Sequence, residues 1–330
     1  MEKRRVMFII NPSAGVGKGR RRFGEIEKWL NKNTEKMKIE PVNEFTEKSG
    51  EKNATALAKR AVLERYDLIV SVGGCGTHNE VANGVIGSDM PVAFVPAGSG
   101  NDFTGALGIP KDVAEALIVA FTGRVRPVDV GVVNGRIFIN IFGVGFDAKI
   151  TQYAAELKQK LPFSPNTLLY LIALFRELFL KLKYQHLEVI LDNKKDPVRK
   201  IAGRATLVLV ANGPSCGGIF KLAPQADLRD GLFDLCWIEK TSRLRILRFI
   251  PKGIKGTHLS LPEVRKESDG RLPKLSSLVI SSLDNHEMPY QMDGETFLDR
   301  KDFPLAKEYK ISILPLVFNV VVPQALEFGF

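Results

Sequence analysis

The stretch Val70-Ser71-Val72-Gly73-Gly74-Cys75-Gly76-Thr77-His78-Asn79 decides the fold of this chain. The run Asp67-Leu68-Ile69-Val70 leads into it as a strand, and a helical pattern begins at Asn79. A strand, a glycine turn and a helix start favour an anion site, because glycines let the backbone approach a phosphate and a helix N-terminus offers free N–H groups. An ordinary strand-to-helix turn of an α/β sheet is the alternative.

Two further junctions of the same kind flank this one. The strand Val6–Ile10 meets a loop over residues 11–19 and three arginines at 20–22, without the spacing of a Walker A loop. A solvated basic helix start is the alternative for this loop. The strand Pro91–Val95 ends in a third loop over residues 96–103, rich in glycine and hydroxyl residues.

Strand and helix patterns alternate through residue 121. The remaining elements of this half are a strand over 38–45 and helices over 23–30, 54–64 and 113–121. Alternation predicts a parallel sheet with helices on both faces. Ligands of such sheets bind at the carboxyl ends of the strands, where all three glycine loops lie.

Beyond Arg124 the pattern changes to short strands separated by Gly, Pro, Asn and Asp. Asn134-Gly135 predicts a hairpin turn between strands at 128–133 and 136–142. Helices are expected at 146–158 and 167–183, and strands near 187–191, 205–211, 232–239, 278–282, 290–292, 309–314 and 317–322. The predicted fold class is therefore α/β: a Rossmann-like parallel-sheet domain over residues 1–125, and a β-sandwich-like, β-rich domain over 126–314. Return of residues 315–330 to the first domain is left open.

The amino-acid composition is that of an ordinary globular protein with an excess of basic over acidic residues. Of 330 residues, 45% are hydrophobic and 25% charged, and the net charge is +10. Such an excess favours a polyanionic partner such as nucleotide phosphate or an anionic membrane, and solubility alone is the alternative. No signature of a nucleic-acid-binding module accompanies the charge, so no nucleic-acid partner is expected.

Cysteine usage and hydropathy indicate a cytoplasmic protein. Cys75, Cys216 and Cys236 lie far apart and form no zinc or disulfide pattern. The apolar run near the N-terminus is too short for a signal peptide. The longest apolar stretch, Thr167 to Leu182, contains Arg176 and Glu177 and falls short of a membrane span.

Two acidic clusters in the second half of the chain are candidates for a metal site and for a catalytic base. Asp227, Asp230 and Asp234 alternate around a glycine turn, a pattern that suits Mg²⁺, although a turn with solvated acids is the alternative. Asp293-Gly294-Glu295 places carboxylates at a tight turn, where one is suited to act as a general base, although such turns are common.

Taken together, the motifs resemble the bacterial soluble diacylglycerol kinase-like lipid kinases, grouped with sphingosine, ceramide and NAD kinases. The resemblance is carried by the loops already quoted and by Gly145-Phe146-Asp147-Ala148, Ala211-Asn212-Gly213, Asp230-Gly231 and Asp293-Gly294-Glu295. It spans nearly the whole chain in order. It implies a nucleotide-binding domain and a β-rich lipid domain with ATP in the cleft between them.

The resemblance also implies roles for single residues. Contacts with ATP are implied for Asn11, Pro12, Ser13, Ala14, Gly15, Thr46, Gly73, Gly74, Cys75, Gly76, Thr77, His78, Asn79 and Ser99. A structural Mg²⁺ is implied at Asp227, Asp230 and Leu232, with Asp227 and Leu232 binding through their backbone carbonyls. Catalysis is implied at Glu295 as base, together with Asp293 and Cys75. Cys75 stands where the family has an aspartate, and a thiol with a pKa of about 8.5 is a poor ligand for magnesium.

The leading hypothesis is an ATP- and Mg²⁺-dependent kinase of diacylglycerol or a similar lipid alcohol, with activity reduced by Cys75. Its partner is a lipid at a membrane surface, contacted peripherally, and a homodimer is a further expectation. Arg20, Arg21 and Arg22 are candidates for phosphate or membrane contact, and Phe175 and Phe179 for the lipid entrance. A non-catalytic nucleotide- or lipid-binding protein, or a kinase of a soluble alcohol such as NAD, are the alternatives.

Overall fold

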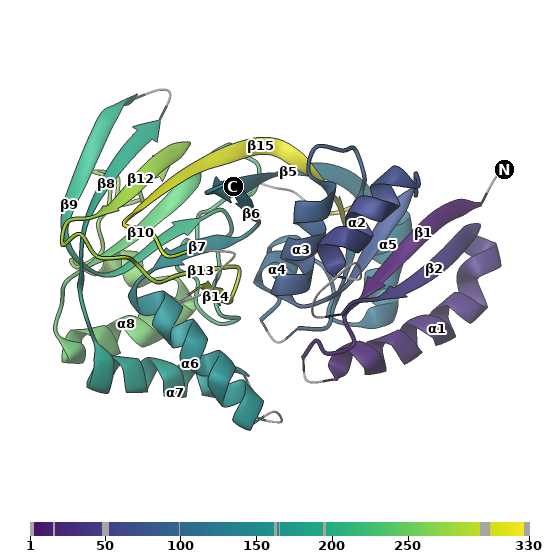
Figure 1. Cartoon of the computed structure of the whole chain (residues 1–330), viewed down its shortest axis with the longest axis horizontal. Helices are drawn as coiled ribbons and strands as arrows, with labels where there is room; N and C mark the ends of the chain where they lie inside the picture. Colours follow the sequence, from purple (N-terminus) through teal and green to yellow (C-terminus); the bar gives the residue numbers. More distant parts are fainter. Residues whose placement is uncertain are drawn as a thin grey trace. The chain divides into compact units, whose positions relative to one another are not determined.

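The structure is a computed structural model that describes residues 3–15, 17–47, 53–98, 100–161, 164, 166–193, 196–297 and 304–326. The chain divides into two compact units (Figure 1). Unit 1 contains Met1–Asp129 and Pro315–Phe330, and unit 2 contains Val130–Leu314. The last strand, β15, contributes residues to both units.

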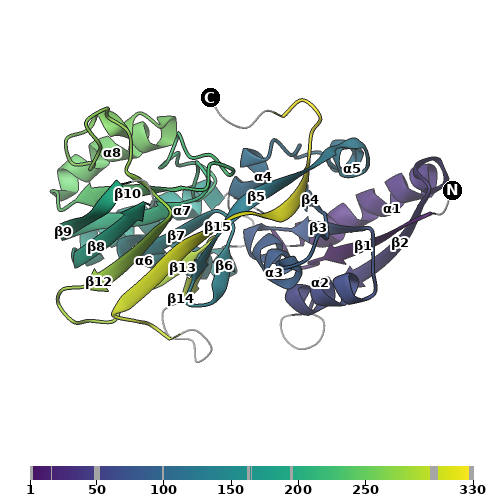
Figure 2. The same cartoon turned by 90° about the horizontal axis from the view of Figure 1, so that it is seen from above.

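Unit 1 is built on a parallel sheet in the strand order β4-β3-β1-β2. Its strands are β1 (Arg4–Ile10), β2 (Ile39–Phe45), β3 (Leu68–Gly73) and β4 (Val92–Pro96), and its helices are α1 (Lys18–Met37), α2 (Ala54–Leu63), α3 (Cys75–Val85), α4 (Asp102–Ala106) and α5 (Val113–Thr122). Every residue of β3 and β4 is buried, because helices cover both faces of the sheet. In Figure 2, α1 and α5 lie on one face and α2 and α3 on the other.

Unit 2 is a largely antiparallel, β-rich unit with three helices. Its strands are β5 (Arg124–Val133, shared with unit 1), β6 (Arg136–Phe138), β7 (Ile141–Val144), β8 (Gln185–Asn193), β9 (Asp196–Ala211), β10 (Phe233–Glu239), β11 (Lys274–Leu275), β12 (Ser277–Ser282), β13 (Tyr290–Met292), β14 (Glu295–Phe297) and β15 (Glu308–Val322). Its helices are α6 (Phe146–Lys160), α7 (Asn166–Arg176), continued by a π-helical turn at Glu177–Lys181, and α8 (Arg243–Lys255), followed by a 3-10 turn at His258–Ser260.

The central strands of unit 2 are buried on both faces. In β9, Val208 and Val210 belong to one hydrophobic core and Leu207 and Leu209 to another, as the two-residue period of a strand requires. Residues of α6, α7 and α8 form a third core, and the three helices lie together beside the sheet in Figure 1. This packing explains why strands such as β10 read as continuous apolar runs.

The α/β fold class is confirmed, and several elements differ in extent from the sequence-based expectation. Helix α1 begins at Lys18, five residues before the expected start, so the basic cluster is helical. The two expected C-terminal strands are a single strand, β15, with Leu316 at a positive φ of 54° inside it. The backbone N–H of Leu316 donates to Asp129 at 2.8 Å, which supports this irregular residue within unit 1.

Candidate active site

Three glycine loops meet at the carboxyl edge of the unit 1 sheet. They follow β1, β3 and β4, which are neighbours in the sheet. The Asn11 Nδ2 donates to Thr77 Oγ1 at 2.9 Å, which joins the first loop to α3. The backbone N–H groups of Ala97 and Gly98 both donate to the Gly73 carbonyl, at 2.7 and 3.0 Å, which joins the second loop to the third.

The loops approach one another closely enough to require glycine. A Cβ on Gly98 would lie 2.5 Å from the Cα of Gly74, and a Cβ on Gly15 would lie 2.3 Å from the Ala97 carbonyl oxygen. Gly15 also has a positive φ of 56°. Since these neighbours are backbone atoms, they cannot move aside as a flexible side chain would. The three loops therefore form one continuous backbone surface.

The helices that begin at two of these loops carry no side-chain cap. The N-caps of α1 and α3 are Gly17 and Gly74, without a capping hydrogen bond or an acidic residue in the first turn. By contrast, Asn53 and Asp112 cap α2 and α5 at 2.8 and 3.1 Å. An uncapped N-terminus presents N–H groups and a partial positive charge. The loop edge is therefore suited to bind an anion.

The other residues expected at this edge vary in exposure. Ser13 is exposed and its N–H donates to Asn11 Oδ1 at 3.0 Å, whereas Ala14 is buried. Cys75 and Gly76 are partly exposed in the first turn of α3. The Thr46 N–H donates to the Ile10 carbonyl at 2.8 Å, so Thr46 lies at the same edge. The predicted contact at Ser99 lies outside the described residues.

His78 and Asn79 are both buried, unlike a residue that binds ligand from a loop surface. The His78 side chain is 0% exposed; its Nδ1 lies 2.8 Å from Ser71 Oγ, and its ring packs against Phe94. Burial lowers the pKa of His78 to about 3, so the imidazole is neutral. This position does not support the predicted contact between the His78 side chain and phosphate. Asn79 Oδ1 accepts from Asn83 at 3.0 Å within α3.

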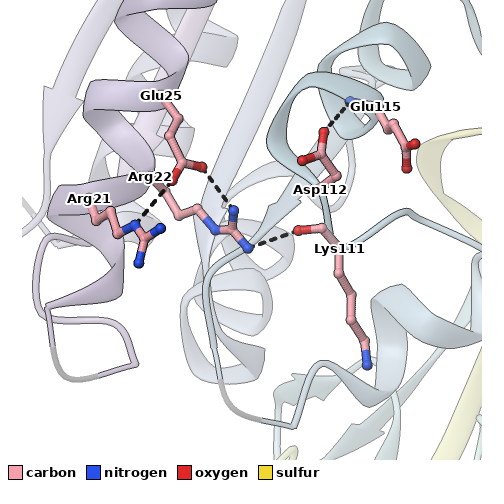
Figure 3. A network of polar contacts seen from close by, with 6 residues as sticks. All are labelled: Arg21, Arg22, Glu25, Lys111, Asp112 and Glu115. Carbon is pink, nitrogen blue, oxygen red and sulfur yellow. Dashed lines mark hydrogen bonds and ion pairs between the residues drawn. The ribbon is translucent and has the colours of Figure 1, made fainter.

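The arginines after the first loop differ in their contacts (Figure 3). Arg22 donates to Glu25 at 2.9 Å and to the Lys111 carbonyl at 2.9 Å, which ties α1 to the segment before α5. Arg21 pairs with Glu25 at 3.3 Å and its side chain is 84% exposed. Arg22 therefore has a structural role, whereas Lys18, Arg20 and Arg21 are exposed near the loop.

In unit 2, the turn between β13 and β14 is fixed on two sides. Asp293 has a positive φ of 48°. Its carboxylate accepts hydrogen bonds from the backbone N–H groups of Ile139, Asn140 and Ile141, at 2.8, 2.9 and 2.9 Å. The Gly294 N–H donates to Gln291 Oε1 at 3.0 Å. These contacts support a positioning role for Asp293, while the partly exposed Glu295 remains the candidate base.

Gln291 links this turn to a second buried acid. Its Nε2 donates to Asp147 Oδ2 at 2.7 Å. Burial raises the pKa of Asp147 to about 6, against the opposing effect of the Gln291 hydrogen bond. Asp147 lies in the first turn of α6 and lines a pocket of unit 2.

This pocket is apolar and lies between α6, α7, α8 and the sheet of unit 2. Its empty space, part of it open to solvent, is about 770 Å³. Its apolar walls include Phe146, Ile150, Leu174, Leu207, Ile246 and Phe249. Thr241, 9% exposed, also lines it, and its Oγ1 is buried without a hydrogen-bond partner. The pocket therefore suits a largely apolar ligand with a few polar groups.

The predicted metal residues lie in the turn before β10, beside a lysine. The Asp227 and Asp230 carboxylates accept the backbone N–H groups of Arg229 and Leu232, both at 3.0 Å, and Lys274 bonds to Asp230. No group of three His, Cys, Asp or Glu residues arranged for a metal occurs within the described ranges. Burial raises the pKa of Asp234 to about 7, against the attraction of Lys274. The Lys274 ammonium beside Asp230 disfavours a divalent cation at this turn, and the Mg²⁺ site at Asp230 and the backbone carbonyls of Asp227 and Leu232 stays a prediction.

Among the residues that the structure covers, no helix is both long and apolar enough to span a bilayer.

The chain has a parallel α/β unit, whose loop edge is suited to an anion, and a β-rich unit with an apolar pocket. These features define a two-domain class of protein. Comparisons with known proteins place the chain in a family of this class. Residues 5–133 match the family model described as the diacylglycerol kinase catalytic domain. Residues 140–327 match the YegS C-terminal NAD kinase beta sandwich-like domain. The chain belongs to the diacylglycerol kinase family.

Curated relatives and solved structures agree with this assignment. A diacylglycerol kinase of Staphylococcus aureus (strain bovine RF122 / ET3-1) is 33% identical over 297 residues, covering 89% of this chain and 86% of the relative. One of Bacillus subtilis (strain 168) is 36% identical over 211 residues, covering 63% and 67%. Two solved chains from Bacillus anthracis str. Sterne align over 99% of this chain and 100% of their own length. One has a TM-score of 0.75 at 25% identity, and the other has a TM-score of 0.69 at 22% identity. The family match and the names of the relatives support a kinase as the class of enzyme.

Sequence reasoning missed Gln291 and Lys274. Gln291 lies 144 residues from Asp147, and Lys274 lies 44 residues from Asp230, so no local spacing indicates either contact. For His78, the sequence did carry a signal. His78, Val81, Ala82 and Val85 are spaced as one helical face, and all four are buried.

Proposed function

We propose that this protein is an ATP-dependent lipid kinase that transfers the γ-phosphate to the hydroxyl of diacylglycerol or a similar lipid alcohol. The donor side rests on the loop edge of unit 1, where the N-termini of α1 and α3 are uncapped and the loops present a backbone surface suited to phosphates. The exposed Lys18 and Arg20 add positive charge near it.

The proposal that the acceptor is a lipid rests on the apolar pocket of unit 2. A soluble alcohol such as NAD is polar over its whole surface and would leave these apolar walls unmatched. An acyl chain gains free energy by leaving water for a pocket lined by Ile150, Leu174 and Ile246. This pocket favours a lipid alcohol over a soluble one.

In this proposal, Glu295 accepts the proton of the lipid hydroxyl as its oxygen bonds to the γ-phosphorus and the bond to ADP breaks. Mg²⁺ would arrive with the ATP phosphates and neutralise their charge. Asp293 and Gln291 hold the turn that carries Glu295. Cys75, in the first turn of α3, supplies no carboxylate, and we propose that this lowers the rate.

The test is transfer from labelled ATP by the full chain to diacylglycerol in mixed micelles, with NAD as the competing acceptor. We expect a phosphorylated lipid and no phosphorylated NAD. Glu295→Gln should lower turnover by about 100-fold while ATP binding, measured by calorimetry, is unchanged. Cys75→Asp should raise turnover by about 10-fold or more.

Cys75→Asn is the matched control, because it has the size of aspartate without the charge. If ATP binds but neither the wild type nor Cys75→Asp transfers phosphate, the chain is a nucleotide- or lipid-binding protein. If NAD is phosphorylated and the lipid is not, the acceptor assignment is wrong.

We further propose that the protein acts from the cytoplasm at a membrane surface, since its substrate is a lipid. Flotation with lipid vesicles tests this contact.

A further inference from the structure

The acidic turn before β10 is paired with a positively charged side chain of the same chain, Lys274. Asp227, Asp230 and Asp234 face Lys274, the first residue of β11. The Lys274 ammonium bonds to Asp230 Oδ2 and lies 3.6 Å from Asp234 Oδ2. Asp234 is 1% exposed, and its Oδ2 is buried without a hydrogen-bond partner, so the ammonium is the charge that faces it.

Backbone pairing places the lysine there. In the antiparallel ladder between β10 and β11, Lys274 is directly opposite Asp234. The flanking Leu272 and Leu275 are buried in hydrophobic cores, and the Leu235 N–H donates to the Pro273 carbonyl at 2.9 Å. Opposite charges in a cross-strand pair attract, and the anchored flanks hold the ammonium in place.

Three carboxylate oxygens of this turn already accept hydrogen bonds. Asp230 uses one oxygen for the Leu232 N–H and the other for Lys274, and Asp227 uses Oδ1 for the Arg229 N–H. A hard divalent ion needs several free oxygen ligands at once. An ammonium among these carboxylates would also repel such an ion, because like charges repel strongly where solvent is partly excluded.

We propose that Lys274 supplies the structural cation of this turn, so that the turn needs no divalent metal. The inference does not depend on the kinase assignment, since it concerns the fold of unit 2. It confines any Mg²⁺ requirement of this protein to the nucleotide.

The experiment is thermal unfolding of the full chain without nucleotide, in EDTA and in MgCl₂, with calorimetric titration of MgCl₂. The wild type should unfold at the same temperature in both and take up no stoichiometric Mg²⁺. Lys274→Met should lower the midpoint by roughly 3–8 °C, and Lys274→Arg, which keeps the charge, should retain most of the stability. Lys310→Met is the control, because the Lys310 side chain is 78% exposed and its ammonium lies 3.7 Å from Glu308.

Two results would overturn the proposal. One is a wild type that loses stability in EDTA or binds one equivalent of Mg²⁺ without nucleotide. The other is a Lys274→Met variant as stable as Lys310→Met. Should Lys274→Met fail to fold, the wild-type titration and Lys274→Arg still decide the question.

Discussion

At the scale of single residues, the central loop contains two side chains with opposite environments. Cys75 is partly exposed in the first turn of α3, whereas His78, three residues later, is fully buried against Phe94. Residues three apart lie on the same side of a helix, so the difference arises along the helix: Cys75 is the first residue of α3, whereas His78 is one turn further on and packs against Phe94 of β4. Sequence reasoning grouped these residues because it read the motif as one loop.

The buried His78 predicts an acid-dependent loss of stability. Its pKa is about 3 in the folded chain and about 6.5 in an unfolded one, so below pH 6.5 the unfolded state binds the extra proton. The stabilisation is complete above pH 6.5 and declines toward pH 3, by at most about 1.4 kcal/mol per pH unit. Unfolding curves of wild type and His78→Gln between pH 7 and pH 4 should therefore converge as the pH falls.

The control for this prediction is His286→Gln, since His286 is exposed. A constant difference between wild type and His78→Gln across this pH range would contradict it.

At the scale of elements, the helices that follow the first and second glycine loops begin without a side-chain cap. Asn53, Asp112 and Ser242 cap α2, α5 and α8, whereas α1 and α3 begin at glycines without a side-chain cap. A glycine N-cap costs only about a few tenths of a kcal/mol relative to a capping side chain, and a bound anion offsets that cost. Helices α4 and α6 also lack a side-chain cap, so the missing caps of α1 and α3 favour an anion only in combination with the glycine loops that precede them.

Gly98→Ala tests whether the contact between loops matters. Its Cβ would lie 2.5 Å from the Gly74 Cα, so the second and third loops must separate. We expect a loss of roughly 1–3 kcal/mol in the free energy of unfolding, together with weaker ATP binding. Differential scanning calorimetry and nucleotide titration measure the two effects.

Gly24→Ala in α1 is the matched control, because an added Cβ there meets no atom within 4 Å. It should leave binding unchanged and stabilise the helix by about 1 kcal/mol at most. Equal ATP binding by wild type and Gly98→Ala would show that the loops do not act as one surface.

At the scale of the whole molecule, the two halves of the proposed reaction belong to separate compact units. The glycine loops proposed to bind phosphate lie in unit 1, and the apolar pocket and the Glu295 turn lie in unit 2. A change confined to the pocket should therefore alter the use of lipid without altering the binding of ATP.

Ile246→Trp tests this separation, because Ile246 lines the pocket from α8 and is 6% exposed. The larger side chain should fill acyl space and lower turnover of long-chain diacylglycerol by about 10-fold or more, with a smaller effect on short chains and none on ATP affinity. Steady-state kinetics over an acyl-length series provides the measurement.

Leu244→Trp on the same helix is the control, since Leu244 is 72% exposed. Equal loss of activity with both substitutions, or with all chain lengths, would contradict an acyl pocket at this place.

The sequence by itself determined the α/β fold class, the three glycine loops and the family. These features are local: periodicity defines strands and helices, and glycines mark where a chain turns or approaches another. Alternation of strand and helix then placed the loops at one sheet edge, because parallel strands share their carboxyl ends.

Only the tertiary structure decided which side chains meet. The Asp147–Gln291 hydrogen bond, the Lys274 ion pair and the apolar pocket all join segments that packing brings together. Lys274 reaches Asp230 because β10 and β11 are paired in a particular register, and register depends on the whole sheet. Sequence spacing carries no record of such pairs, since their partners are tens to more than a hundred residues apart.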